Sequence, residues 1–260
     1  MKKNYKILVL SDLNKSTSKT LKSSISLAKI VNAEINFFHV KSPSDVVDTE
    51  NQLSAMRSIN QNYIITNNKI TKLINSISNA YNVNVNHTFT TGNVKNEIEK
   101  YIEENKPDII VLGKRKSKLV NFIGDNITQF VLNKYKGIIV IADGNNVLEP
   151  NKELALGLFN NSITNDAFLR EIIESTKKPL NYFKIVESLT TTNGENILNN
   201  NTIEYAFVKG SSVVKNISNY LSKSNVDLLC INRVNSISGT TKTNLSNLIS
   251  KLDCSLILTP

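Results

Sequence analysis

The chain has 260 residues, enough for two domains of about 130 residues each. Its hydrophobic content of 40% suits globular cores, and no run approaches the roughly 18 apolar residues of a membrane span. The net charge of +9 comes from lysines spread along the chain, without a helix-turn-helix, zinc-finger or RNA-binding signature, so we expect no nucleic-acid partner. The start, Met1–Tyr5, leads directly into a strand without a signal-peptide pattern, which predicts a cytoplasmic protein without a membrane anchor.

Short apolar runs alternate with helical periodicity in the first half of the chain. Lys6–Leu10 reads KILVL, the pattern of a strand buried on both faces of a parallel sheet. Ile70, Leu73, Ile74 and Ile77 recur at helical spacing. The predicted order is strand Lys6–Leu10, helix 16–31, strand Ile35–Val40, helix Asn60–Tyr81, strand Val83–Phe89, helix Val94–Asn105, strand Ile109–Leu112, a helix opening near 124–126, and strand Ile138–Ala142. This alternation predicts an α/β fold with an open parallel sheet and right-handed crossovers.

The pattern begins again after a linker, Gly144–Pro150. The next predicted elements are strand Glu153–Phe159, helix Asp166–Ser175 and strand Leu180–Val186, whose LNYFKIV resembles the earlier INFFHV. Further on, four residues recur at a constant offset of 119 positions. They are Ile98, Tyr101, Ile102 and Asp108, matched by Ile217, Tyr220, Leu221 and Asp227. The sequence therefore predicts an internal duplication.

The two copies differ in length. Val40 and Gly113 are 73 positions apart, whereas the corresponding Ile185 and Asn232 are 47 apart. We therefore predict two tandem domains, residues 1–144 and 151–260, of which the second is shortened and lacks the counterpart of the helix at 60–81. Its first strand is followed by Asn160 and Asn161 instead of an aspartate, and Asn232 replaces Gly113, so this half is interpreted as structural.

Open α/β sheets bind ligands at the carboxyl ends of their strands. Two loops should meet there, Ser11–Leu13 and the segment that follows Gly113. Asp12 can hold an adenine or a ribose hydroxyl through charge-assisted hydrogen bonds, and glycine lets a backbone approach a ligand closely. Four basic residues follow this glycine: Lys114, Arg115, Lys116 and Lys118. They are interpreted either as a solvated loop or as a phosphate-binding loop.

Over about its first 140 residues the chain resembles the universal stress protein family. The resemblance rests on the ILVLSD strand and loop, on Thr91–Val94, and on the PDIIVLG run that ends at Gly113. It implies tandem Rossmann-like domains of the adenine nucleotide alpha hydrolase-like kind, with Asp12 at the adenine-contacting position and Val40 as a further binding candidate. Family members dimerise through their last strands, so we expect Ile138–Ala142 and Ser255–Leu258 to pair.

Nucleotide-binding members of this family carry Gly-x2-Gly-x9-Gly-[Ser/Thr] after the fourth strand. Gly113 fits the first glycine, but Lys116 stands at the second. Gly124 follows Gly113 by 11 residues where the family pattern has 13, and it is followed by Asp125 and Asn126. An Asp125 carboxylate would cap the helix N-terminus and repel a phosphate. We expect a degenerate nucleotide site, with no cofactor bound; binding of ATP or AMP through Asp12 and the basic loop 114–118 is the alternative.

Catalytic signatures are missing from the sequence. It contains no G-x-S-x-G elbow and no P-loop, and its two histidines, His39 and His87, are expected on strands. The two cysteines, Cys230 and Cys254, are expected to be buried, and no metal site is predicted. We expect a stress-response or regulatory protein that is not an enzyme and acts through a protein partner or self-association. A nucleotide-binding sensor is the second hypothesis and a slow nucleotide hydrolase the third.

Overall fold

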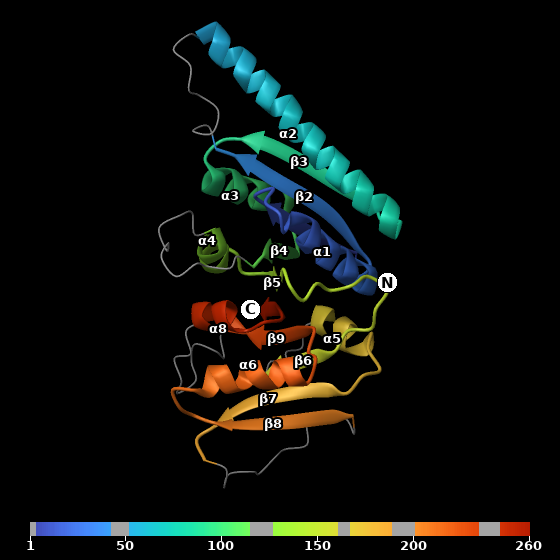
Figure 1. Cartoon of the computed structure of the whole chain (residues 1–260), viewed down its shortest axis with the longest axis vertical. Coiled ribbons are helices and arrows are strands. Elements are labelled where there is room, and N and C mark those ends of the chain that lie inside the picture. The colour runs from blue at the N-terminus through green and yellow to red at the C-terminus, as the bar shows by residue number, and fades with distance from the viewer. Residues whose placement is uncertain (1–3, 43–51, 115–126, 161–166, 189–200, 234–244) are drawn as a thin grey trace.

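The structure, a computed structural model, is described for residues 4–42, 52–114, 127–160, 167–188, 201–233 and 245–260. Within these residues, ten strands form one sheet in the order β3-β2-β1-β4-β5-β10-β9-β6-β7-β8 (Figure 1). The N-terminal half supplies β1–β5 and the C-terminal half supplies β6–β10. Each half has its strands in the order 3-2-1-4-5, counted within the half, so the α/β prediction is confirmed.

The N-terminal half follows the predicted order closely. Its strands are β1 (Tyr5–Ser11), β2 (Ala33–Lys41), β3 (Val85–Thr91), β4 (Ile109–Gly113) and β5 (Ile138–Ala142), all parallel. Its helices are α1 (Thr17–Val31), α2 (Gln52–Tyr81), α3 (Val94–Asn105) and α4 (Ile127–Lys134). Helix α2 begins eight residues before the predicted Asn60. The predicted helix was too short because the first turns of α2 extend past the sheet (Figure 1). Met56 and Ile59 remain exposed there, so these turns lack the regular spacing of buried apolar residues that marks a helix in the sequence.

Among its described residues, the C-terminal half repeats this arrangement without a counterpart of α2. Its strands are β6 (Leu156–Phe159), β7 (Leu180–Val186), β8 (Thr202–Val208), β9 (Leu228–Asn232) and β10 (Ser255–Thr259), and its helices are α5 (Ala167–Glu174), α6 (Val213–Lys223) and α8 (Leu245–Lys251). Residues 187–201 alone separate β7 from β8, too few for a helix of 30 residues, so the predicted loss is confirmed. Strand β8 was not predicted.

The surface that α2 covers in the first half has changed chemically in the second. In the N-terminal half, His39 of β2 pairs in register with Phe89 of β3. The corresponding pair in the C-terminal half is Lys184 and Ala206, and Lys184 also forms an ion pair with Glu204. At the positions equivalent to the stacked rings beneath α2, the C-terminal half therefore carries a charged pair and a small side chain.

Contacts at the strand starts confirm the match of Asp108 with Asp227. The Asp108 carboxylate accepts a hydrogen bond from the Lys6 N–H at 2.9 Å, just before the start of β4. The Asp227 carboxylate accepts one from the Ala155 N–H at 2.8 Å, just before β9. Equivalent aspartates thus link the first strand to the fourth strand by a hydrogen bond in both halves. The domain boundaries at residues 144 and 151 stay a prediction, because one sheet runs through both halves.

Strands β5 and β10 pair antiparallel at the centre of the sheet, as expected. Ile141 pairs with Leu256, Val140 with Ile257, and Ile139 with Leu258. This register is symmetric about the pair Val140 and Ile257, so the halves are related by an approximate two-fold axis there. The chain is its own pseudo-dimer, and Figure 1 shows the halves on either side of this junction.

Two apolar layers cover the faces of the sheet. One is built with α1, α2 and α5, and the other with α3, α4, α6 and α8. The cysteines are free and buried as predicted, and they lie in different layers; burial raises the pKa of Cys230 and of Cys254 to about 12. None of the described helices is long and apolar enough to cross a membrane.

Candidate functional site

An open cavity of about 930 Å³ lies at the carboxyl ends of β1, β4 and β5. Asp12, Lys15 and Lys19 line it from the loop after β1 and the start of α1. Lys114 lines it from the end of β4, and the segment 143–145 from the end of β5. Ser250 and Asp253 reach it from the C-terminal half. The structure therefore brings Asp12 and Lys114 to one opening, at the edge of the sheet where ligands bind in this fold class.

The loop after β1 is held mainly by its own hydrogen bonds. The Asp12 carboxylate accepts hydrogen bonds from the Asn14 N–H at 3.3 Å and from the Asn14 side-chain amide at 3.1 Å. Leu13 adopts a positive φ of 55°, and its carbonyl accepts a hydrogen bond from Lys69 of α2 at 3.0 Å. The Asp12 carboxylate thus already serves to fix its loop in the protein without a ligand.

His39 and Val40 lie near the end of β2, and His39 pairs in register with Ser11, just before this loop. Val40 is partly buried against the layer that contains α3. The His39 Nδ1 lies 2.8 Å from the Ser11 carbonyl, which can only accept, so Nδ1 carries the proton. Burial lowers the pKa of His39, opposed by this hydrogen bond and by the nearby Asp12 carboxylate. The ring stacks on Phe89, which stacks on Tyr63 of α2, so His39 packs under a helix as predicted.

His87, the other histidine, is exposed on β3, which is an edge strand of the sheet as predicted.

Gly113 has a packing role in the protein without ligand. A Cβ atom at this position would lie 2.6 Å from the Thr20 Oγ1, well inside van der Waals contact. Glycine here therefore allows helix α1 to approach the end of β4 closely. The sequence suggested that this glycine leaves room for a ligand; the structure gives it a second reason that needs no ligand.

We expect Gly113→Ala to lower the free energy of unfolding by about 1–3 kcal/mol, because the new methyl group overpacks the contact with Thr20. Denaturant unfolding without ligand measures this change. In the double variant Gly113→Ala/Thr20→Ala, the clashing hydroxyl is gone, and most of the loss should be recovered. An unchanged stability of Gly113→Ala would contradict this packing role.

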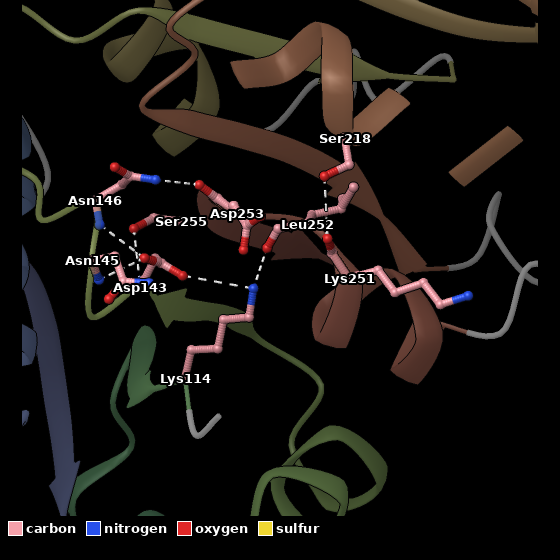
Figure 2. A network of polar contacts seen from close by, with 9 residues as sticks. All are labelled: Lys114, Asp143, Asn145, Asn146, Ser218, Lys251, Leu252, Asp253 and Ser255. Carbon is pink, nitrogen blue, oxygen red and sulfur yellow. Dashed lines mark hydrogen bonds and ion pairs between the residues drawn. The ribbon is translucent and has the colours of Figure 1, made fainter. Parts of the chain in front are cut away.

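Lys114 points toward Leu252 of the C-terminal half (Figure 2). Its Nζ donates a hydrogen bond to the Leu252 carbonyl and lies 3.6 Å from the Asp143 Oδ2. The exposed fractions of the two side chains are only 10% and 5%. This is a nearly buried ion pair, in which each charge compensates the desolvation of the other.

Asp143 is the centre of this network (Figure 2). Its Oδ1 accepts hydrogen bonds from the Asn145 N–H at 2.7 Å and the Asn146 N–H at 2.8 Å. Its own N–H donates to the Ser255 Oγ at 3.0 Å, and the Asn146 side chain donates to the Asp253 carbonyl. The segment after β5 is thus joined to the segment before β10.

Sequence reasoning did not include Asp143, Ser250 and Asp253 in the site. The expected pairing of β5 with β10 was the signal that could have found them. An antiparallel pair places the residues after one strand beside the residues before the other.

The remaining candidates, Arg115, Lys116, Gly124, Asp125 and Asn126, lie outside the described residues, as does Lys118. The departures from the glycine motif therefore stay predictions from sequence. Among the residues that the structure describes, no group of three or more His, Cys, Asp or Glu side chains could hold a metal ion.

A parallel sheet of order 3-2-1-4-5 with helices on both faces defines the Rossmann-like α/β class. Residues 3–140 match the model of the universal stress protein family, and the chain belongs to this family.

Two solved structures extend the similarity to the whole chain. A universal stress protein from Archaeoglobus fulgidus matches with a TM-score of 0.70 and 14% identity, over 98% of this chain and 95% of that chain. A functionally unknown protein from Pseudomonas aeruginosa matches with a TM-score of 0.58 and 11% identity, over 99% and 93%. At such identities these matches establish the fold alone. No curated protein sequence matches the chain.

Proposed function

We propose that this universal stress protein acts in the cytoplasm as a stress-response or regulatory protein through protein contacts, without catalysis and with a degenerate nucleotide site. The observation that carries the proposal is the position of Lys114. This cation follows Gly113, where the sequence offers it to a phosphate, but it is bound to the Leu252 carbonyl and the Asp143 carboxylate. A phosphate could recruit it only by leaving Asp143 as a nearly buried, unpaired charge, which is costly.

The carboxylates around the opening add to this argument. Asp12, Asp143 and Asp253 all line the cavity, and each repels the negative charges of a polyphosphate. The Asp12 carboxylate also supports the turn at Asn14, so a ligand would compete with the loop's own hydrogen bonds.

A sensor that binds ATP or AMP is the second candidate. The cavity of about 930 Å³ is within the range of small-molecule sites, and Lys15 and Lys19 line it next to Asp12. In this alternative, Asp12 would hold the base or the ribose. These lysines, together with the basic loop after Gly113, would supply point charges for phosphate.

Calorimetric titration of the full chain with ATP and AMP, with and without magnesium, separates the two candidates. The proposal predicts no heat and no rise in melting temperature at millimolar nucleotide. A ligand at 100 times its Kd would stabilise the protein by about 2.7 kcal/mol. Saturable binding that Asp12→Ala or Lys15→Ala weakens would establish the sensor instead. Lys178→Ala, far along the chain from the cavity residues, is the matched control for loss of a positive charge.

A further inference from the structure

Lys114 and Arg233 occupy equivalent places in the two halves. Lys114 directly follows the last residue of β4, and Arg233 directly follows the last residue of β9. The two positions are 119 residues apart, the same offset that relates Asp108 to Asp227. Both copies of the duplicated unit therefore place a basic residue where the fourth strand of the half ends.

Arg233 reaches from the C-terminal half into the N-terminal half. Its guanidinium donates hydrogen bonds to the carbonyls of Gly137 at 2.6 Å, Tyr135 at 2.9 Å and Leu132 at 3.4 Å. These carbonyls belong to the last turn of α4 and the residues after it, and helix-end carbonyls lack intrahelical partners. A cation is favourable at this end of a helix. Burial lowers the pKa of Arg233, but guanidinium remains charged.

Lys114 makes the reverse connection, from the N-terminal half into the C-terminal half. Its ammonium group donates to the carbonyl of Leu252, the residue that directly follows α8. Helix α8 stands in the C-terminal half where α4 stands in the N-terminal half, immediately before the last strand. Each basic residue therefore binds the C-terminal end of the last helix in the opposite half.

The two contacts lie at opposite ends of the β5–β10 pair. The Lys114 N–H donates to the carbonyl of Ala142, at the carboxyl end of β5. The Arg233 Nε donates to the carbonyl of Thr259, at the carboxyl end of β10. Since β5 and β10 are antiparallel, these carboxyl ends lie at opposite ends of the junction.

We propose that Lys114 and Arg233 are reciprocal braces that hold the two halves of the chain together at the interface formed by β5 and β10. Each brace satisfies helix-end carbonyls of the opposite half and keeps the pairing surface of the last strands closed within one chain. This role goes beyond the proposed function and does not depend on it, because it holds whether or not the cavity binds a nucleotide.

Hydrogen exchange of the full chain, followed by mass spectrometry, tests the braces in Lys114→Met and Arg233→Met. In each variant, peptides from β5 and β10 should exchange faster by about tenfold or more, the effect of losing a charged hydrogen bond. Peptides from β2 and β7, far from the junction, should keep their protection. Lys134→Met is the control, because Lys134 is an exposed basic residue of α4 that pairs with Glu99 in its own half.

The outcome depends on which strands exchange faster in the variants. Unchanged exchange at β5 and β10, or an equal increase over all strands, would overturn the proposal, since either result means that the residues do not brace the junction. If the methionine variants fail to fold, Arg233→Lys decides in their place. It retains the charge but loses the planar group that serves several carbonyls at once, so it should accelerate exchange at β5 and β10 selectively. ATP titration of the same variants is a separate readout, so failure of one proposal leaves the other measurable.

Discussion

Replacing Ile257 with alanine should lower the free energy of unfolding by about 2–5 kcal/mol. Ile257 lies at the centre of the junction, in register with Val140, and neither side chain is exposed to solvent. The substitution removes apolar surface and leaves a cavity at the point where both halves share their core. Guanidinium unfolding followed by circular dichroism measures the change.

Two further variants control this experiment. Ile257→Val removes one methylene and should cost only about 0.5–1.5 kcal/mol. Ile59→Ala removes the same atoms from α2, where the side chain is 41% exposed, and should change stability by no more than about 0.5 kcal/mol. A loss in Ile257→Ala as small as that in Ile59→Ala would mean that the junction contributes little to folding.

Phe183→Ala is expected to destabilise the C-terminal half by about 3–5 kcal/mol. Phe183 is fully buried in β7, and its ring stacks on those of Tyr205 and Phe207. The distances between ring centroids are 5.1 Å to Tyr205 and 6.3 Å to Phe207. Both partners belong to β8, the edge strand, so the loss of this ring removes the main aromatic contact that holds β8 to the sheet. Thermal unfolding should show a lower melting temperature, and exchange should increase first in β8.

Tyr220→Ala is the comparison for this variant. Tyr220 contacts Tyr205 and Phe207 from α6, but its side chain is 42% exposed. Its removal should cost clearly less than the removal of Phe183, because less surface returns to water. Equal losses for the two variants would contradict the view that burial in β7 determines the stability of this edge.

The two halves of the chain differ in how they protect their outer strands. In the N-terminal half, α2 covers β2 and β3 and its Lys69 fixes the loop after β1. The C-terminal half has no such helix among its described residues, and the Lys184–Glu204 pair lies on its outer strands β7 and β8. The half with the candidate site thus has additional support for the loop that carries Asp12. The interpretation of the other half as structural stays a prediction.

The class of fold, the duplication and the family were all predictable from the amino-acid sequence. These follow from local patterns: continuous apolar runs such as Lys6–Leu10 specify buried strands, and the offset of 119 positions relates the halves. The pairing of β5 with β10 was also predicted, from the family resemblance. Strand β8 was missed because Glu204 shortens its continuous apolar run to Tyr205–Val208, on a strand that only one neighbour pairs with.

The contacts of the basic residues Lys114 and Arg233 could not be predicted from the sequence. In the sequence, Lys114 is one of several cations after a glycine, and Arg233 follows a buried strand without any signal of its own. Lys114 binds the carbonyl of Leu252, and Arg233 binds carbonyls near Tyr135, both about 100 or more positions away in the sequence. These partners are backbone groups, which every residue carries, so no side chain in the sequence marks them. Which carbonyl a cation meets depends on how the two halves are placed, and that placement follows from the packing of β5 against β10.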